Sequence, residues 1–144
     1  MTARAPHVAE PPARYDLRPP KVVDCSAIAA LVFRETTFES AARLLDGAAL
    51  HAPHLIQLEL VSVALKKHRR GEAHALAGLD LALSLELYLH SVDPAMVFAL
   101  AERYQLSAYD AAYLSLAADL RCPLVTFDER LAAAAQTHLA QLSG

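Results

Sequence analysis

The amino-acid sequence predicts a three-layer α/β/α sandwich, in which helices cover both faces of a central parallel sheet of four to five strands. The chain of 144 residues is 55% hydrophobic and 20% charged, which suits one domain with a substantial core. Short apolar segments of strand length alternate with longer segments in which apolar residues recur at helical spacing. Because strands that are separated by helices pair in parallel through right-handed crossovers, this alternation leads to the sandwich.

The first residues are expected to lie outside the domain. Residues 1–20 hold five of the eight prolines and lack apolar periodicity, so we expect a disordered leader there. An arm that wraps a partner is the functional alternative. The domain itself is predicted to span residues 21–144.

The first elements of the domain follow in close succession. Lys21–Asp24 is expected to form a short buried strand, and the apolar run after Ser26 a helix. A second helix should cover about Thr37–Leu45, with Gly47 as its C-terminal cap. Ala48–His51 is expected to be the next short strand.

The middle of the chain is predicted to be mainly helical. Pro53 suits the first turn of a long helix that runs to about Arg70 and is closed by Gly71. A further helix is expected over about Glu72–Leu87. Tyr88–Val92 would then return to the sheet as a strand.

The last third repeats the alternation. Helices are expected over about Pro94–Tyr104 and Asp110–Arg121, followed by a buried strand at Pro123–Thr126. In the last segment, residues 131–144, we expect an edge strand at His138–Leu142.

The composition excludes several classes of function. The formal charge of −3, from 13 basic and 16 acidic residues, does not by itself indicate a polyanion partner. The four glycines form no Gly-rich phosphate loop, so ATP and NAD are not expected. Two cysteines are too few for a disulfide framework or a zinc cluster. With no membrane-length apolar stretch and no secretory signal, we expect a cytoplasmic protein with reduced thiols and no membrane partner.

Three aspartates are predicted to meet at one edge of the sheet. Asp24 ends the first strand, and Asp128 follows the strand at Pro123–Thr126. Asp110 lies in the first turn of the helix that leads into that strand. Because parallel strands end, and their crossover helices begin, on the side where ligands bind, these carboxylates should face the same site.

Glu59 is the fourth acid of this predicted site. It lies in the long helix, and its neighbours on that helix face are apolar, namely Leu55, Ile56 and Val63. A carboxylate in such surroundings is costly unless a cation compensates it. Since the helix carries no Lys or Arg before Lys66, a metal ion shared with the aspartates would provide the compensation.

Each acid also has a purely structural interpretation. Ser107 and Asp110 match a helix capping box, and Asp128 is a plausible N-cap. Asp24 is a possible turn residue, and Glu59 would be solvated if its helix turned that face outward. A shared cause explains four acids at one edge better than four coincidences.

The four carboxylates indicate which metal the site would bind and which reaction it would support. Crowded carboxylates raise one another's pKa, and hard divalent cations relieve the repulsion. Oxygen ligands select Mg²⁺ or Mn²⁺ over zinc, and none of the seven histidines belongs to an HExxH pair. Such a site, with one or two metal ions, supports hydrolysis of phosphodiester bonds.

Four segments carry a recognisable family pattern. These are VVDCSAIAALV, APHLIQLELVSVALKK, LSAYDAAYLSLAADL and CPLVTFDERL. In order and spacing they resemble PIN-domain ribonucleases, and more narrowly the VapC-like toxins of type II toxin–antitoxin systems. The resemblance extends from Lys21 to the end of the chain.

This resemblance implies a metal-dependent endoribonuclease with a PIN-like fold. The catalytic and metal-binding residues would be the acidic quartet Asp24, Glu59, Asp110 and Asp128. Ser26 and Thr126 match positions that support the site through hydroxyl contacts. The implied partners are an RNA substrate, a second copy of the chain in a homodimer, and a small antitoxin whose C-terminal tail occupies the groove. Two features depart from the family: Ser62 stands where many relatives have Asn, and the proline-rich leader is unusual.

Basic residues close the long helix. Lys66, Lys67, Arg69 and Arg70 could bind RNA phosphates. The structural alternative is that cations at a helix C-terminus are stabilised by the helix dipole.

Other chemistry has weaker support. Cys25 lacks an evident activating partner and is expected to be a buried structural residue. Tyr104, Tyr109 and Tyr113 could stack on bases, although packing is the simpler interpretation. The alternative functions are a Mg²⁺-binding signalling domain of the receiver type and a PIN fold that acts mainly as a binding partner.

Overall fold

The chain folds around a parallel sheet, as the computed structural model shows for His7, Ala9 and residues 17–142. The strands are β1 (Pro20–Val23), β2 (Ala49–Pro53), β3 (Leu87–His90) and β4 (Leu124–Val125). They lie in the order β3-β2-β1-β4, and every pair is parallel. The predicted α/β/α fold class is therefore confirmed, with four strands in the described part of the chain.

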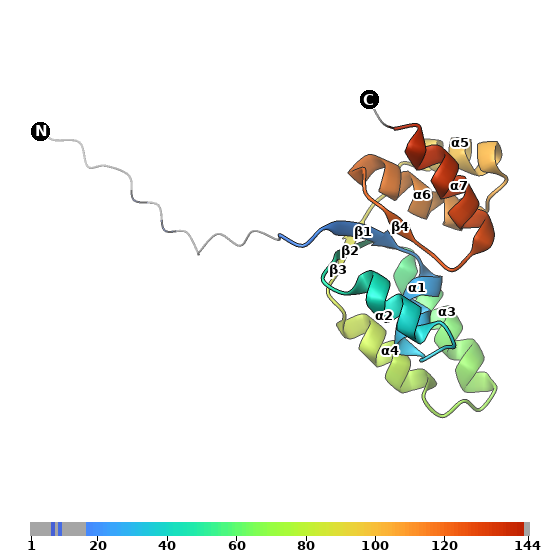
Figure 1. Cartoon of the computed structure of the whole chain (residues 1–144). Helices are drawn as coiled ribbons and strands as arrows, with labels where there is room; N and C mark the ends of the chain where they lie inside the picture. Colours follow the sequence, from blue (N-terminus) through green and yellow to red (C-terminus); the bar gives the residue numbers. More distant parts are fainter. Residues whose placement is uncertain (1–6, 8, 10–16, 143–144) are drawn as a thin grey trace, which may run out of the picture.

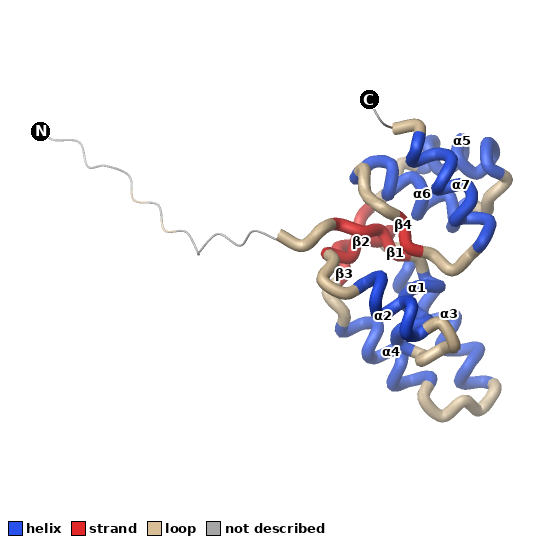
Figure 2. Tube along the Cα trace, viewed as in Figure 1, coloured by secondary structure: helices blue, strands red, loops and turns tan. Residues whose placement is uncertain are grey.

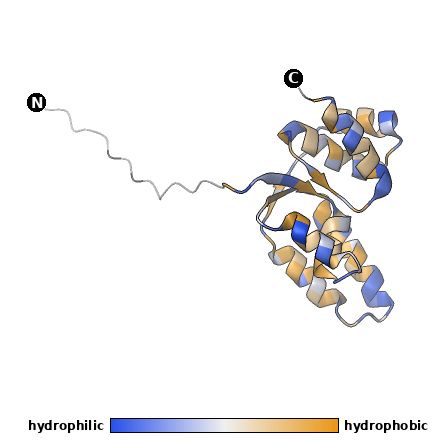
Figure 3. Cartoon of the chain, viewed as in Figure 1, coloured by the Kyte–Doolittle hydropathy of each residue, from blue (hydrophilic) through white to orange (hydrophobic). Residues whose placement is uncertain are grey.

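Helices cover the sheet on both sides (Figures 1 and 2). One layer holds α1 (Cys25–Val32), α2 (Phe38–Leu45), α3 (Ile56–Arg69) and α4 (Ala75–Ser84). The other holds α5 (Pro94–Tyr104), α6 (Ala108–Leu120) and α7 (Glu129–Ala140). Hydrophobic and hydrophilic residues alternate along these helices (Figure 3).

The core lies where β1 meets α1 and α6. Val22 and Val23 of β1 are fully buried, and so is Ile28 of α1. In α6 the residues from Ala111 to Ala117 are buried without interruption. Three of these seven positions are alanines, whose small side chains suit close packing of the helix against the sheet. No helix in the described part is long and apolar enough to cross a bilayer.

Three predicted boundaries are wrong. Pro53 does not open the long helix but ends β2, opposite His90 of β3. The pairing of β2 with β1 stops at His51, so the missing N–H of Pro53 removes no bond from that ladder. The helix predicted over Glu72–Leu87 is shorter at both ends. It begins at Ala75 and ends at Ser84, and Leu87 already belongs to β3.

The last segment is also different from the prediction. No strand forms at His138–Leu142, because α7 continues through Ala140. Asp128 caps this helix by accepting a hydrogen bond from the Leu131 N–H at 2.8 Å. The alanine-rich sequence that follows has a high helix propensity and carries the helix past the short apolar pattern that suggested a strand.

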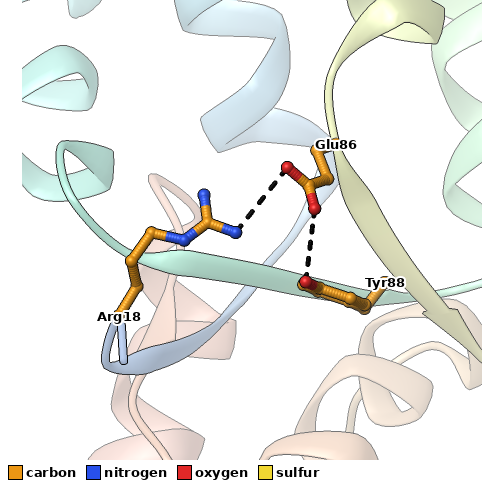
Figure 4. Close-up of polar contacts among 3 residues, drawn as sticks. All are labelled: Arg18, Glu86 and Tyr88. Carbon is orange, nitrogen blue, oxygen red and sulfur yellow. Dashed lines mark hydrogen bonds and ion pairs between the residues drawn. The ribbon is translucent and has the colours of Figure 1, made fainter. Parts of the chain in front are cut away.

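The predicted leader, residues 1–20, lies mostly outside the described residues. Arg18, just before β1, forms an ion pair with Glu86 at 3.7 Å, and the Tyr88 hydroxyl donates to the same carboxylate at 3.2 Å (Figure 4). The chain entering β1 is thus tied to the start of β3.

Candidate active site

The four predicted acids lie at the starts of four different helices. Asp24 is the N-cap of α1, and Asp128 is the N-cap of α7. Asp110 lies in the first turn of α6 and Glu59 in the first turn of α3. Helix N-termini present free N–H groups and the positive end of the helix dipole, so they stabilise negative charge. The sequence expectation that these acids follow strands or open helices agrees with this arrangement.

Asp24 is the most completely held of the four. Its residue is only 4% exposed. Its Oδ1 accepts hydrogen bonds from the Ala27 N–H at 3.0 Å and from the Ser26 hydroxyl at 2.7 Å, and its Oδ2 accepts one from the Thr126 hydroxyl at 2.5 Å. Burial nevertheless raises the pKa of Asp24, and the nearby charge of Asp128 adds to the rise. The three donors partly oppose it by stabilising the carboxylate.

Ser26 and Thr126 join the ends of β1 and β4. The Ser26 hydroxyl, while donating to Asp24, accepts from the Phe127 N–H at 2.9 Å. The Thr126 hydroxyl accepts from the Asp128 N–H at 3.0 Å. Both residues predicted to support the site therefore contact Asp24 directly and fix the chain that leads to Asp128.

Glu59 is oriented by a residue of α6. The Tyr113 hydroxyl donates to Glu59 Oε1 at 2.5 Å, and the Tyr113 residue is 1% exposed. Burial raises the pKa of Glu59, and the charges of Asp110 and Asp24 raise it further, whereas the hydrogen bond from Tyr113 lowers it. Burial and the neighbouring carboxylate also raise the pKa of Tyr113, so its hydroxyl stays a hydrogen-bond donor.

Tyr113 is the functional residue that sequence reasoning missed. It was expected to pack in the core or to stack on a base, and only its packing is seen. A buried tyrosine needs a partner for its hydroxyl, and Tyr113 lies one helical turn after Asp110, which would have been the available signal.

Asp110 lies in the capped first turn of α6. Ser107 is the N-cap of α6, and its hydroxyl accepts from the Asp110 N–H at 3.1 Å. Burial raises the pKa of the Asp110 carboxyl, as do the charges of Asp128 and Asp24, while Ser107 and Arg130 lower it. Ser107 is thus the cap of α6, and the carboxylate of Asp110 is left at the sheet edge, where the site was predicted.

The acids interact with one another but do not form a closed cage. Each of Asp24, Glu59 and Asp110 has its pKa raised in part by the charge of another member of the quartet. Among the described residues, no group of three or more His, Cys, Asp or Glu side chains is arranged to hold a metal ion by itself. Mg²⁺ commonly binds one or two carboxylates and completes its octahedron with waters and substrate phosphates, so an open set of carboxylates fits it.

Cys25 is not a nucleophile of this site. Burial and the charges of Glu59, Asp24 and Glu35 raise the pKa of its thiol to about 12. The thiolate, which is the reactive form, is therefore strongly disfavoured. Cys25 is half-buried, whereas a buried residue was expected.

The basic residues at the end of α3 differ in their contacts. Lys67 lies 3.6 Å from both Glu35 and Glu72 and 5.4 Å from the centre of the Phe33 ring. Lys66, Arg69 and Arg70 are exposed, and no ion pair engages them among the described residues.

Comparison with known sequences identifies the fold family. Residues 21–136 match the family model described as PIN domain. The chain is 34% identical over 113 residues to ribonuclease VapC9 of Mycobacterium tuberculosis, an alignment that covers 76% of this chain and 87% of that protein. It is 37% identical over 121 residues to ribonuclease VapC3 of Pyrobaculum aerophilum, covering 77% of this chain and 91% of that protein.

Solved structures show the same architecture. A crystal structure of a Pyrobaculum aerophilum protein superposes with a TM-score of 0.63 at 26% identity, covering 86% of this chain and 96% of that one. The crystal structure of VapC20 of Mycobacterium tuberculosis, described as a toxin that cleaves the sarcin-ricin loop, gives a TM-score of 0.58 at 20% identity. It covers 79% of this chain and 94% of that one, and at this identity it shows the fold alone.

Proposed function

The chain belongs to the PIN-domain family and, within it, to the VapC ribonucleases, and from this membership we propose that it is a Mg²⁺- or Mn²⁺-dependent endoribonuclease that acts as the toxin of a toxin–antitoxin pair. The predicted ribonuclease family is confirmed by these relatives. The receiver-type signalling domain loses its support, because that alternative rested only on acids at strand ends.

One observation carries the assignment of the catalytic residues. Asp24, Glu59 and Asp110 each have a pKa raised by burial and, to a smaller extent, by the charge of other acids: Asp128 acts on Asp24, Asp110 and Asp24 act on Glu59, and Asp128 and Asp24 act on Asp110. The protein nevertheless supplies donors to Asp24 and Glu59 that stabilise and orient the ionised carboxylate. A protein that keeps mutually repelling carboxylates charged and oriented is prepared for a cation.

The residues of this chain would have distinct roles in the reaction. Asp24, Glu59, Asp110 and Asp128 would hold the metal, one or two of them directly and the others through its waters, and the bound metal would supply a water of lowered pKa and neutralise charge on the phosphate. Ser26 and Thr126 keep both oxygens of Asp24 in a fixed direction. Tyr113 does the same for Glu59. The helix N-termini that carry the acids would also favour the charge that develops on a phosphate at this edge.

Replacement of the acids tests this proposal. In Asp24→Asn and in Asp110→Asn, cleavage of RNA in the presence of Mg²⁺ should fall by roughly a hundredfold or more, because metal-based charge stabilisation contributes several kcal/mol. Gel analysis of the products under single-turnover conditions measures the rate.

Asp119→Asn is the matched control for Asp110→Asn. Asp119 is exposed near the other end of α6, so the same chemical change there should leave cleavage unaltered. Full cleavage by folded Asp24→Asn or Asp110→Asn protein would remove the role assigned here. If the wild-type protein binds a small partner but never cleaves RNA, the PIN fold serves mainly as a binding partner.

The same proposal includes partners. We infer a homodimer and a small antitoxin protein, as the family resemblance implies. Large apolar side chains support protein contacts, since Leu58, Phe98 and Tyr109 are 76%, 71% and 64% exposed. A structure of VapBC2 from Rickettsia felis bound to a DNA fragment from its promoter has the same fold, with a TM-score of 0.56 at 15% identity. Both cysteines are free thiols, consistent with a reducing, cytoplasmic location.

A further inference from the structure

We propose that a single-stranded RNA substrate runs along one side of α3, from Glu59 at the active site to the C-terminal end of the helix, with backbone phosphates on Lys66 and Arg70. This inference rests on the proposed ribonuclease function and adds the path that the RNA follows outside the cleavage site.

The helix itself places the three side chains in one row. Lys66 and Arg70 follow Glu59 by seven and eleven residues, which are close to two and three whole turns of an α-helix. They lie about 10 Å and about 16 Å farther along the helix axis than Glu59, at a rise of ~1.5 Å per residue. A chain that leaves the active site along this row would therefore pass both cations in sequence.

The burial pattern shows which side of the helix the row occupies. The inner face is marked by the buried residues Ile56, Leu60 and Ala64. At 100° per residue, Glu59, Lys66 and Arg70 fall within about 40° of one another, roughly a quarter turn from that inner face. Ser62, exposed and polar, lies beside them, so this side of α3 is open to solvent beyond Glu59.

The opposite side of the exposed surface has a different character. Leu58 and Leu65 are 76% and 43% exposed, and they lie across the helix from the cationic row. The outer surface of α3 thus has a polar side along the row and a side with two exposed leucines, which the exposed Arg69 interrupts at the end of the helix. A polyanion fits the polar side, whereas the side with the leucines suits a protein.

Lys67, next to Lys66, differs from the cations of the row because its charge is already engaged. Lys67 is engaged by Glu35, Glu72 and the Phe33 ring, and it turns towards the core. Lys66 and Arg70 are exposed without an ion pair among the described residues, so their charges remain available. The end of α3 is correspondingly one of the strongly hydrophilic parts of the surface in Figure 3. Of the predicted basic group, the structure assigns Lys66 and Arg70 to RNA and Lys67 to the fold.

The salt dependence of RNA binding tests the proposal. Affinity for a fluorescein-labelled single-stranded RNA is measured by anisotropy over a range of salt concentrations, in an Asp24→Asn background that prevents cleavage. Each phosphate contact contributes about 0.7 to the slope of log affinity against log salt on a single strand. Lys66→Gln with Arg70→Gln should therefore reduce the slope by about 1.4 and weaken binding about 25-fold at 0.1 M salt.

Arg43→Gln is a control that removes one exposed positive charge away from the proposed path. Arg43 is exposed on α2, near the end of the helix that leads to the start of β2, which is the sheet edge opposite to the acids. This variant should keep the slope of the parent protein. Thermal unfolding of each variant confirms that the exposed substitutions leave the fold intact.

The outcomes separate this inference from the proposed function. RNA binding with an unchanged slope in the double variant overturns the path along α3, whether or not the wild-type protein cleaves RNA. A reduced slope supports the path even if no Mg²⁺-dependent cleavage is found, and in that case the nuclease proposal alone fails. Absence of any RNA binding overturns the path as well.

Discussion

Tyr113 shows how a single side chain connects the core to the active site. Its ring is packed in the interior, and its only polar atom reaches Glu59 at 2.5 Å. Glu59 has a flexible side chain on a partly exposed helix, so this hydrogen bond selects one orientation of its carboxylate. Tyr113 is therefore a positioning residue, which acts through Glu59.

Removal of this hydroxyl should raise the requirement for metal. In Tyr113→Phe the ring stays packed, but Glu59 loses its donor, and loss of such a supporting contact typically costs about 10- to 100-fold in metal affinity. The concentration of Mg²⁺ that gives half-maximal cleavage should rise accordingly, while the maximal rate at saturating Mg²⁺ changes less.

Tyr109→Phe is the control for this prediction. Tyr109 lies on the same helix but is 64% exposed, so removal of its hydroxyl should leave the Mg²⁺ requirement unchanged. An unaltered Mg²⁺ requirement in Tyr113→Phe would show that Tyr113 only packs.

At the same scale, the sequence placed the acids and the two hydroxyls that contact Asp24, but it missed the support that Tyr113 gives to Glu59. Asp24, Asp110 and Asp128 could be placed because a strand end or a helix start is a local pattern. Their capping and site roles were treated as alternatives, yet each capping hydrogen bond leaves the carboxylate at the site edge. Tyr113 could not be paired with Glu59, because the two are 54 positions apart and only the fold brings them together.

Among the elements, the ends of β1 and β4 act as one unit. Ser26 bonds both to Asp24, two residues earlier, and to the Phe127 backbone about a hundred residues later. β4 is short, with only Leu124 and Val125 in the strand, so this hydroxyl bridge extends the connection beyond the backbone ladder.

Ser26→Ala should weaken this connection. The Phe127 N–H and one carboxylate oxygen of Asp24 would each lose a partner, at a cost of about 1–3 kcal/mol in the free energy of unfolding. Urea unfolding measures the loss, and RNA cleavage should fall with it, because Asp24 is less well oriented. Ser62→Ala, at an exposed position of α3, should leave the free energy of unfolding unchanged. Equal stability of the Ser26 and Ser62 variants would contradict the bridge.

Element type was easier to predict than element boundaries. The helix at Pro94–Tyr104 was predicted with its observed ends, because Asp93 and Pro94 are local start signals. The end of the chain was misjudged, since a few apolar residues after an alanine-rich helix also suit a last helical turn. The role of Pro53 depended on where the pairing between β1 and β2 stops, which no local pattern reveals.

For the whole molecule, the active site is a source of pH dependence. The pKa values of Asp24, Glu59 and Asp110 lie above their ordinary values of 3.8, 4.5 and 3.8, first of all because of burial. Above these ordinary values the folded protein therefore binds protons that the unfolded chain has released. The free energy of unfolding must then fall as the pH rises through the raised pKa values.

Metal-free protein should accordingly lose stability on account of these acids over the pH range above their ordinary pKa values. Mg²⁺ binds the ionised carboxylates, so the increase in melting temperature that it produces should be larger at the upper end of this range. Asp24→Asn removes one of the buried charges, and its stability should fall less steeply with pH. A Mg²⁺ effect that is equal across the range would contradict this account.

Asp24 and Asp128 are helix caps as well as proposed catalytic residues, and this combination has a genetic consequence. Asparagine caps a helix about as well as aspartate, and the two residues differ by one base in their codons. Under the catalytic roles proposed for these acids, a single point mutation at either position would silence the enzyme while leaving a full-length, folded chain that still presents its surfaces to other proteins. Loss of toxicity in this fold need not pass through loss of structure, so inactive alleles can persist as competent binding partners.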